Sequence, residues 1–326
     1  MFGFHMAKIS VIIPAYNMAS LIGETLDSVL RNETDMDIVV VDDASSDDTC
    51  AVVEEYISRH PNIRLMRSET NTGPGVARNR ALATINSEYC LCHDADDLLH
   101  AGALDLVLPL MDETKIDVTS FKYSLMRTVD GPLDEMSPLD KTVWDMALGE
   151  READIIDLDS AAQFLMTINY PWNKILRTSF IRRTGWSFSS ARINEDILPH
   201  WAAYMNAGRF LAINRSLSTH RLVPGREQHT STFDERRLEL FAALRDTEKL
   251  FMANPLFRAK YYPIFIVFKA GLVEWAHQRI QPDLQGLFRE YAARSYEHFT
   301  DEDFDNVYQI NPSIALSSYR LKHSGR

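Results

Sequence analysis

Apolar runs and helical repeats alternate over the first hundred residues. The β-branched run at 9–13 ends at Pro14, and apolar residues then recur at helical spacing over 22–30. The alternation continues with strand-like runs at 38–41, 63–66 and 89–93 and with helical repeats at 52–57 and 77–83. Such alternation is typical of parallel strands joined by crossover helices. The pattern therefore predicts an α/β fold with a mostly parallel central sheet flanked by helices.

The pattern loosens after residue 100. It predicts a helix at 103–111, a strand at 118–123, a helix at 163–168 and a strand at 210–213. The polar stretch 130–159 contains Gly131, Pro132 and Pro138, and we interpret it as irregular. Helical repeats return at 236–252, 262–279 and 284–299. We therefore predict an α/β domain at 1–230 and a helical C-terminal region at 231–326.

Acidic residues outnumber basic ones in this chain. The 46 Asp and Glu residues against 34 Lys and Arg residues give a formal net charge of −12. Proteins that bind nucleic acids normally carry a basic surface that releases counterions. The charge therefore argues against a nucleic-acid partner.

Cysteine content and hydropathy indicate the compartment. Three cysteines cannot form a disulfide framework, which fits a reducing environment, and Cys90 and Cys92 read as core residues. The first ten residues lack the pattern of a secretion signal, and the longest apolar stretch, 261–268, is too short to cross a bilayer. We expect a cytoplasmic protein, with the inner face of the membrane as a second option.

Acidic residues follow several of the predicted strands. Ligands of open parallel sheets bind at the carboxyl ends of the strands, where this chain has Asp42, Asp43, Asp94, Asp96 and Asp97. Carboxylates gathered at one edge repel each other, and a hard cation is the simplest way to hold several oxygen ligands together. Such a cation would also neutralise a bound diphosphate. The edge is therefore a candidate metal and nucleotide site.

Six short strings carry a resemblance to a known family. They are VIIPAYN at 11–17, VVVDDASSDDT at 39–49, NTGPGVARNRAL at 71–82, DADD at 94–97, PWNK at 171–174 and NED at 194–196. In this order they resemble the family 2 glycosyltransferases of GT-A fold, over roughly residues 8–230. The resemblance implies a Rossmann-like GT-A domain, with a nucleotide-sugar-binding half at 1–100 and an acceptor half at 101–230.

The resemblance assigns donor-binding residues position by position. It implies that the turn after the first strand holds the nucleotide base, with Tyr16 stacked on uracil, and that Asp43 accepts a hydrogen bond from the imide N–H. Arg78 is a nucleotide contact in this interpretation, or an ordinary ion pair on the helix surface. The full set of donor-binding residues implied by the resemblance is Pro14, Ala15, Tyr16, Asn17, Asp43, Gly73, Arg78, Asp94 and Ala95.

The acidic string resembles the DXD motif of that family. The resemblance implies that Asp94 lies near the ribose and that Asp96 binds Mg²⁺ or Mn²⁺ between the two phosphates. We interpret Asp97 as a helix cap. His220 is the candidate for a further metal ligand, with His229 as its substitute and a purely structural histidine as the alternative. We expect Asp43 to join Asp94 and Asp96 around the cation.

The NED string resembles the motif that supplies the catalytic base. Asp196 would take the proton of the acceptor hydroxyl, facing the other acids across the sugar, and Glu195 would stabilise the turn or meet an acceptor hydroxyl. One carboxylate base with a metal implies inversion, since double displacement needs a second carboxylate as nucleophile.

The PWNK string marks the expected acceptor side. Trp172, Asn173 and Lys174 would contact the acceptor, although a core tryptophan is an equal alternative for Trp172. Arg221 and Arg226 are candidates for phosphate contacts.

Together these features predict a metal-dependent, inverting glycosyltransferase. The resemblance implies transfer from a nucleoside diphosphate sugar, with UDP as the expected nucleotide, to a glycan or lipid-linked acceptor in envelope or capsular polysaccharide synthesis. A homo-oligomer through the helical region is an additional expectation. The alternatives are a sugar nucleotidyltransferase and a non-catalytic nucleotide-sugar-binding module. A dinucleotide-binding dehydrogenase fits poorly, because Arg78 stands where its fingerprint needs a small residue.

Overall fold

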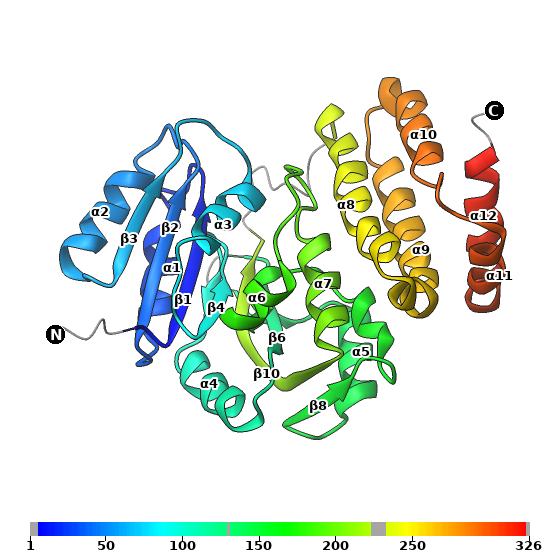
Figure 1. Ribbon diagram of the computed structural model, residues 1–326. Coiled ribbons are helices and arrows are strands. Elements are labelled where there is room, and N and C mark those ends of the chain that lie inside the picture. The colour runs from blue at the N-terminus through cyan, green and yellow to red at the C-terminus, as the bar shows by residue number, and fades with distance from the viewer. Residues whose placement is uncertain (1–5, 129–130, 223–232, 324–326) are drawn as a thin grey trace.

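One ten-stranded sheet runs through the body of the molecule, and a stack of helices follows it at the C-terminal end (Figure 1). The computed structural model describes residues 6–128, 131–222 and 233–323. The strands are β1 Ile9–Ala15, β2 Met36–Asp42, β3 Ile63–Arg67, β4 Tyr89–Cys92, β5 Leu98–Leu99, β6 Val118–Met126, β7 Leu133–Glu135, β8 Ala153–Asp157, β9 Lys174–Arg177 and β10 Arg209–Arg221. The helices of the body are α1 Ile22–Leu30, α2 Thr49–Arg59, α3 Pro74–Leu82, α4 Ala103–Thr114, α5 Pro138–Leu148, α6 Thr178–Thr184 and α7 Ile197–Ala207.

The strand order is β3-β2-β1-β4-β9-β6-β10-β5, with β7 beside β6 and β8 beside β10. The first four strands in this order are parallel, as the sequence predicts. Strand β9 is antiparallel to both β4 and β6, and β10 is parallel to β6. The carboxyl ends of β1, β2, β4, β6 and β10 therefore lie along the same edge of the sheet.

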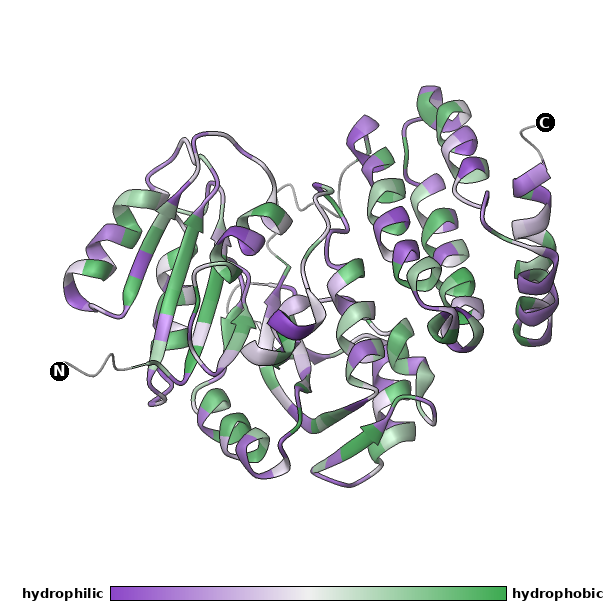
Figure 2. Cartoon of the chain, viewed as in Figure 1, coloured by the Kyte–Doolittle hydropathy of each residue, from purple (hydrophilic) through white to green (hydrophobic). Residues whose placement is uncertain are grey.

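Successive side chains of each strand point to opposite faces of the sheet, so the core has two layers. Val11 and Ile13 of β1 pack against α1, α2 and α4, whereas Ile12 faces the layer that contains α3, α5, α6 and α7. Figure 2 shows the strands of this sheet as largely hydrophobic, as expected for strands covered on both faces.

The stretch 130–159 is not irregular, which corrects the sequence interpretation. Its described residues include β7, α5 and β8. Helix α5 begins where the Ser137 side chain accepts a hydrogen bond from the Asp140 N–H, with Pro138 at the first helical position. Val143 and Trp144 lie on the buried face of α5. The proline that suggested a break is therefore a helix start.

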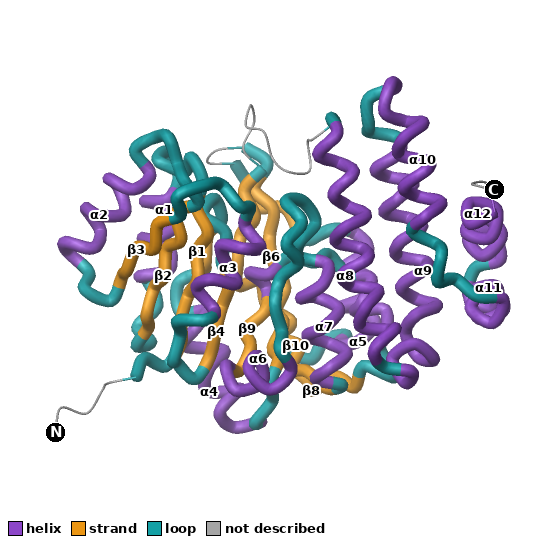
Figure 3. The backbone as a smooth tube through the Cα atoms, turned by 45° about the horizontal axis from the view of Figure 1, so that its top comes forward, coloured by secondary structure: helices purple, strands orange, loops and turns teal. Residues whose placement is uncertain are grey.

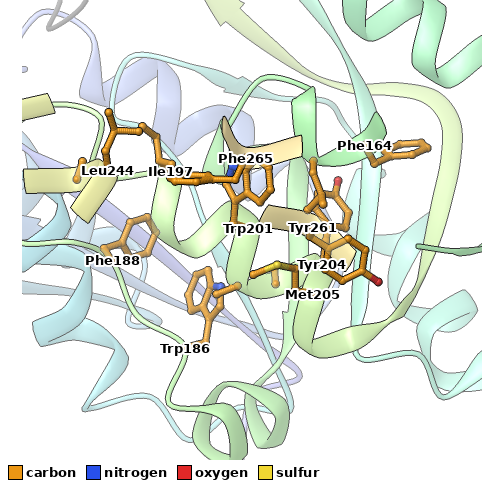
Figure 4. Packing of buried hydrophobic residues seen from close by; sticks show 14 of the residues in the cluster. Phe164, Trp186, Phe188, Ile197, Trp201, Tyr204, Met205, Leu244, Tyr261 and Phe265 are labelled. Atoms are coloured by element: carbon orange, nitrogen blue, oxygen red, sulfur yellow. The ribbon is translucent and has the colours of Figure 1, made fainter. Parts of the chain in front are cut away.

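The helical region packs directly on the body. It comprises α8 Leu240–Ala253, α9 Pro255–His277, α10 Gln285–Arg294, α11 Asp301–Ile310 and α12 Pro312–His323. Figures 1 and 3 show α8 beside α7 from two directions. Trp201 of α7 meets Phe265 of α9, with ring centroids 5.2 Å apart (Figure 4). It also meets Phe251 of α8, with ring centroids 5.9 Å apart.

Several aromatic residues of this region share one hydrophobic cluster with the sheet, namely Phe251, Tyr261, Tyr262 and Phe265, and Phe257 and Phe268 pack against it. The boundary near residue 230 stays a prediction. No helix within the described ranges combines the length and apolarity needed to span a bilayer.

Candidate active site

The loops after β1 and β2 are fastened to each other. The Asn17 side chain accepts a hydrogen bond from the Ser46 N–H at 2.9 Å, and the Asn17 N–H donates to the Ser45 hydroxyl. Pro14 and Ala15 are buried, and the Ala15 carbonyl accepts from the Asp43 N–H. Tyr16 is 45% exposed at the tip of this loop. Its ring is therefore presented on a fixed support, as a stacking residue requires.

Asp43 is buried and fixes the glycine-rich loop. Its carboxylate accepts hydrogen bonds from the Thr72 N–H, the Thr72 hydroxyl and the Gly73 N–H, the last at 2.7 Å. Gly73 has a φ of +89°, which a residue with a side chain rarely adopts. Asp43 thus orders the backbone at the start of α3, whereas its expected contact with the base stays a prediction.

Three acids gather after β4. Among the described residues, ligand atoms of Asp94, Asp96 and Asp97 lie within 4.8 Å of one another. The expectation that Asp43 joins Asp94 and Asp96 is wrong, because its carboxylate is bound to the glycine-rich loop. Ala95, between them, is buried, and its carbonyl accepts from the Thr25 hydroxyl.

Asp97 is not a helix cap. It is fully buried and accepts hydrogen bonds from the Arg221 N–H at 2.9 Å and from His220, whose Nδ1 lies 2.9 Å from its Oδ1. Burial raises the pKa of Asp97 to about 7, although the nearby His220 opposes the shift. Arg221 is also buried and binds Glu24 and Thr25 of α1. In this structure its guanidinium therefore links β10 to α1, a role that differs from the predicted contact with phosphate.

His220 is held in one orientation at the end of β10. The ring stacks on Trp172 with centroids 5.8 Å apart and lies 4.9 Å from the Tyr170 ring. Burial disfavours its charged form, but the charges of Asp97, Asp96 and Asp94 raise the pKa of His220 above its ordinary value. Since Asp97 holds Nδ1, Nε2 is the nitrogen left for a metal, as in many carboxylate–histidine pairs.

The residues fit a divalent cation. Carboxylates at Asp94 and Asp96 are hard oxygen donors, and His220 is oriented by a buried acid. His229 and Arg226 lie outside the described residues.

Arg78 is a buried link between two motifs. Its Nη1 donates to Glu195 at 2.8 Å and its Nη2 donates to Asp94, while the guanidinium lies 4.9 Å from the Phe188 ring centroid. Arg78 is 3% exposed, so the alternative of an ion pair on the helix surface is wrong. The pKa of Arg78 is raised by Asp94 and Glu195 against the opposing effect of burial.

Asp196 stands immediately before α7, after a tight turn. Asn194 in that turn has a φ of +56°, an uncommon conformation that asparagine tolerates better than most residues. Burial, reinforced by the charge of Glu195, raises the pKa of Asp196 to about 8. A carboxylate with a raised pKa is suited to accept a proton near neutral pH.

Trp172, Asn173 and Lys174 are buried, at 0%, 5% and 3% exposure. Direct contact with an acceptor is therefore excluded for them in this structure, and the core alternative for Trp172 is confirmed. Lys174 donates to the Asn173 side chain and to the Tyr170 carbonyl, and burial lowers its pKa to about 7. Of the three, Trp172 packs against the His220 ring.

The sequence reasoning overlooked Tyr170. Its ring stacks on Trp172 at 4.6 Å and stands next to His220. Burial, followed by the charges of Tyr123, Asp97 and Asp196, raises the pKa of its hydroxyl. The residue is only partly buried, whereas Trp172 is fully buried, so Tyr170 is the ring of this stacked pair that a ligand can reach. Its position directly before the PWNK string was the available signal.

This fold and this edge of acidic residues define a class of protein. The family model described as glycosyl transferase family 2 matches residues 10–192, more than half of the chain, and the chain belongs to this family. The family assignment decides against a sugar nucleotidyltransferase.

Two curated relatives are the poly(ribitol-phosphate) beta-N-acetylglucosaminyltransferase TarS of Staphylococcus aureus and the poly(ribitol-phosphate) beta-glucosyltransferase of Bacillus spizizenii. The chain is 31% identical to TarS over 214 residues, which cover 64% of the chain and 34% of TarS. It is 26% identical to the Bacillus protein over 266 residues, 80% of the chain and 39% of that protein. The chain thus spans little more than a third of the length of these relatives.

Solved structures share the fold. A crystal structure of S. aureus TarS 1–349 in complex with UDP-GlcNAc matches with a TM-score of 0.74 at 21% identity, covering 98% of this chain and 88% of that one. The Pyrobaculum calidifontis mannosyltransferase PcManGT, in complex with GDP-Man and Mn²⁺, matches with a TM-score of 0.54 at 17% identity, covering 99% and 88%. The predicted GT-A fold with C-terminal helices is confirmed.

Proposed function

We propose that this protein is an inverting, metal-dependent glycosyltransferase that moves a sugar from a UDP-sugar to a hydroxyl of a glycan or lipid-linked acceptor. The observation that carries the proposal is the buried link between the two motifs. One guanidinium, that of Arg78, binds Asp94 of the DXD-like turn and Glu195 beside the candidate base. Donor-binding and base-bearing groups therefore belong to one site.

The donor end supports a nucleoside diphosphate sugar. Tyr16 offers an exposed ring on a fixed loop, which suits stacking on a base. Gly73 and the N-terminus of α3 come next along the edge, with their backbone fixed by Asp43. UDP is favoured over other nucleotides because the structure of TarS contains UDP-GlcNAc.

Asp94, Asp96 and His220 would hold the cation, Mg²⁺ or Mn²⁺. The bound cation would neutralise the diphosphate and make it a better leaving group. Asp97 would keep the His220 ring in place, as outer-sphere carboxylates do for metal-binding histidines.

Asp196 would act as the general base. In the step itself, an acceptor hydroxyl oxygen bonds to the anomeric carbon, Asp196 takes the hydroxyl proton, and the bond to the diphosphate breaks. A single displacement of this kind inverts the anomeric configuration. Glu195, held by Arg78, would fix the turn that aims Asp196.

The acceptor is proposed from the relatives. Both act on poly(ribitol-phosphate) by their names, so we infer a cell-envelope polymer or its lipid-linked precursor as the acceptor class. Contact with the inner membrane face and assembly into a homo-oligomer stay predictions.

The test is a panel of UDP-, GDP-, CDP- and TDP-sugars with and without Mn²⁺. We expect a UDP-sugar to stabilise the protein against heat only with the metal, and to be turned over to UDP. NMR of the transferred sugar should show inverted anomeric configuration. Binding without hydrolysis or transfer for any donor would favour the non-catalytic module, and retained configuration would contradict the single displacement.

A further inference from the structure

The segment that carries the candidate base is attached to α3 on one side. Asn79 exchanges two hydrogen bonds with the backbone of Phe188, both at 2.9 Å. Gly75 permits the close approach, because a Cβ there would lie 2.3 Å from the Ser189 carbonyl oxygen and 2.9 Å from Glu195 Cγ. Arg78 completes this side through Glu195.

The same segment is attached to the helical region on the other side. Ser189 donates its hydroxyl to Asp246 of α8 at 2.6 Å, and the Arg192 N–H donates to Glu239, directly before α8, at 2.6 Å. Apolar packing accompanies these bonds, since Leu244 of α8 and Ile197, the residue after Asp196, belong to the packed cluster that Figure 4 shows.

These contacts form one continuous polar chain. The Ser189 hydroxyl donates to Asp246 and accepts from the Ala191 N–H, while the Ser189 N–H donates to the Glu195 carbonyl at 3.3 Å. The Glu195 side chain then binds Arg78, which binds Asp94. Ser189 is 2% exposed, so water does not compete for its bonds.

We propose that Asp246 is a positioning residue for the base Asp196, and hence that the helical region is a working part of the active site. The inference rests on the proposed function. Asp246 suits the task because its carboxylate is only 21% exposed and stays charged: the bonds from Lys249 and Ser189 lower its pKa against the effect of burial. A hydrogen bond to a charged acceptor is shorter and stronger than a neutral one.

The experiment compares Asp246→Ala with Asp246→Asn, whose amide oxygen can still accept from Ser189. Asp305→Ala on α11 is the control, because Asp305 is an exposed acid of the helical region outside this chain of bonds. The first readout is hydrogen exchange of the amides of 189–196, without substrate. We expect exchange about tenfold faster in Asp246→Ala than in the wild type, with Asp246→Asn between the two and nearer the wild type, because it keeps the acceptor and loses the charge.

The second readout is release of UDP from the UDP-sugar with Mn²⁺. We expect kcat to fall about 10- to 100-fold in Asp246→Ala, as for a base displaced by about 1 Å, while KM for the donor stays within about twofold. Asp246→Asn should recover most of kcat. Ser189→Ala should reproduce the loss, and the double variant should lose no more than either single variant.

Unchanged exchange, or unchanged kcat with faster exchange, would overturn the inference. Equal losses in Asp246→Asn and Asp246→Ala, or an equal loss in Asp305→Ala, would also overturn it. If Asp246→Ala does not fold, Ser189→Ala breaks the same bond without altering α8 and decides the question. A wild type that turns over no donor would refute the proposed function instead. The hydrogen-exchange result would then still show whether Asp246 holds the segment 189–196 against α8.

Discussion

The donor edge and the base-bearing segment are built in different ways. The loops after β1 and β2 are held by neighbours within the first hundred residues, such as Asn17 with Ser46 and Asp43 with Gly73. The acidic turn after β4 is held by His220 and Arg221 of the α/β body. The base-bearing segment is held by distant parts of the chain: Arg78 is 117 positions from Glu195, and Asp246 is 57 positions from Ser189. A nucleotide site can therefore form within the α/β body, whereas in our proposal Asp196 is aimed only when the helical region is docked.

This difference means that the two halves of the site can be damaged separately. Variants at the base should spare donor binding, and variants at the donor edge should weaken binding of nucleotide or metal while leaving the base segment intact. The four predictions below use that separation.

The largest effect is expected from Asp196→Asn. An amide cannot take the acceptor proton, so kcat should fall about 1,000-fold, within the range that a general base contributes. Affinity for UDP with Mn²⁺, measured by calorimetry, should remain within about twofold because we propose that Asp196 faces the acceptor and not the nucleotide. A variant with nearly full kcat would remove Asp196 from the proposed mechanism.

Asp96→Ala tests the donor edge. Loss of a carboxylate ligand should weaken Mn²⁺-dependent UDP binding by about 100-fold. Losing a residue that only supports a metal ligand weakens metal binding by about 10- to 100-fold, and losing the ligand itself should cost at least as much. In thermal-shift assays, the stabilisation by UDP with Mn²⁺ should largely disappear. Exchange of the amides of 189–196 should match the wild type. Stabilisation by UDP that is equally large without metal would count against the DXD-like assignment.

Tyr16→Ala tests whether the Tyr16 ring stacks on the nucleotide base. Stacking of a base on an aromatic ring contributes about 1–3 kcal/mol, so Kd for UDP should rise about tenfold. Tyr16→Phe, which keeps the ring, is the matched control and should bind UDP like the wild type. Equal losses in both variants would assign the contribution to the hydroxyl and not to stacking.

The last prediction is a pH-dependent difference in stability. Burial and Glu195 raise the pKa of Asp196 to about 8, against about 4 in an unfolded chain, with Arg78 and Asp94 as the other charges that act on it. Between these values the folded state binds the additional proton, so this group's contribution to stability falls as pH rises from about 4 to 8.

Asp196→Asn removes this contribution. Without nucleotide or metal, its Tm relative to the wild type should therefore increase from pH 5 to pH 8 and level off above. Calorimetric scans across this range measure the difference, and a constant difference would contradict the raised pKa.

The sequence predicted the donor half better than the rest. Continuous β-branched runs such as 9–13 and 38–41 can form buried parallel strands and little else, and β1 and β2 contain them. The pattern does not predict helix α5, because Pro138 suggests a break, although proline after Ser137 is a helix-start signal.

The site errors share a physical cause. The roles of Asp97, Arg78 and Trp172 depend on burial and on partners more than 40 positions away, and local patterns do not report either property. The pattern predicts Asp97 as a cap because a helix is expected at 103–111, yet strand β5 follows Asp97 directly, and β10 supplies His220 as its partner.

A crystal structure with UDP and Mn²⁺ tests the central claim most directly. The account predicts uracil on Tyr16, the cation between the diphosphate and the carboxylate of Asp96, and Asp196 on the opposite side of the space left for the sugar. A nucleotide bound away from the carboxyl edge of β1, β2 and β4, or a cation held without Asp96, would contradict it.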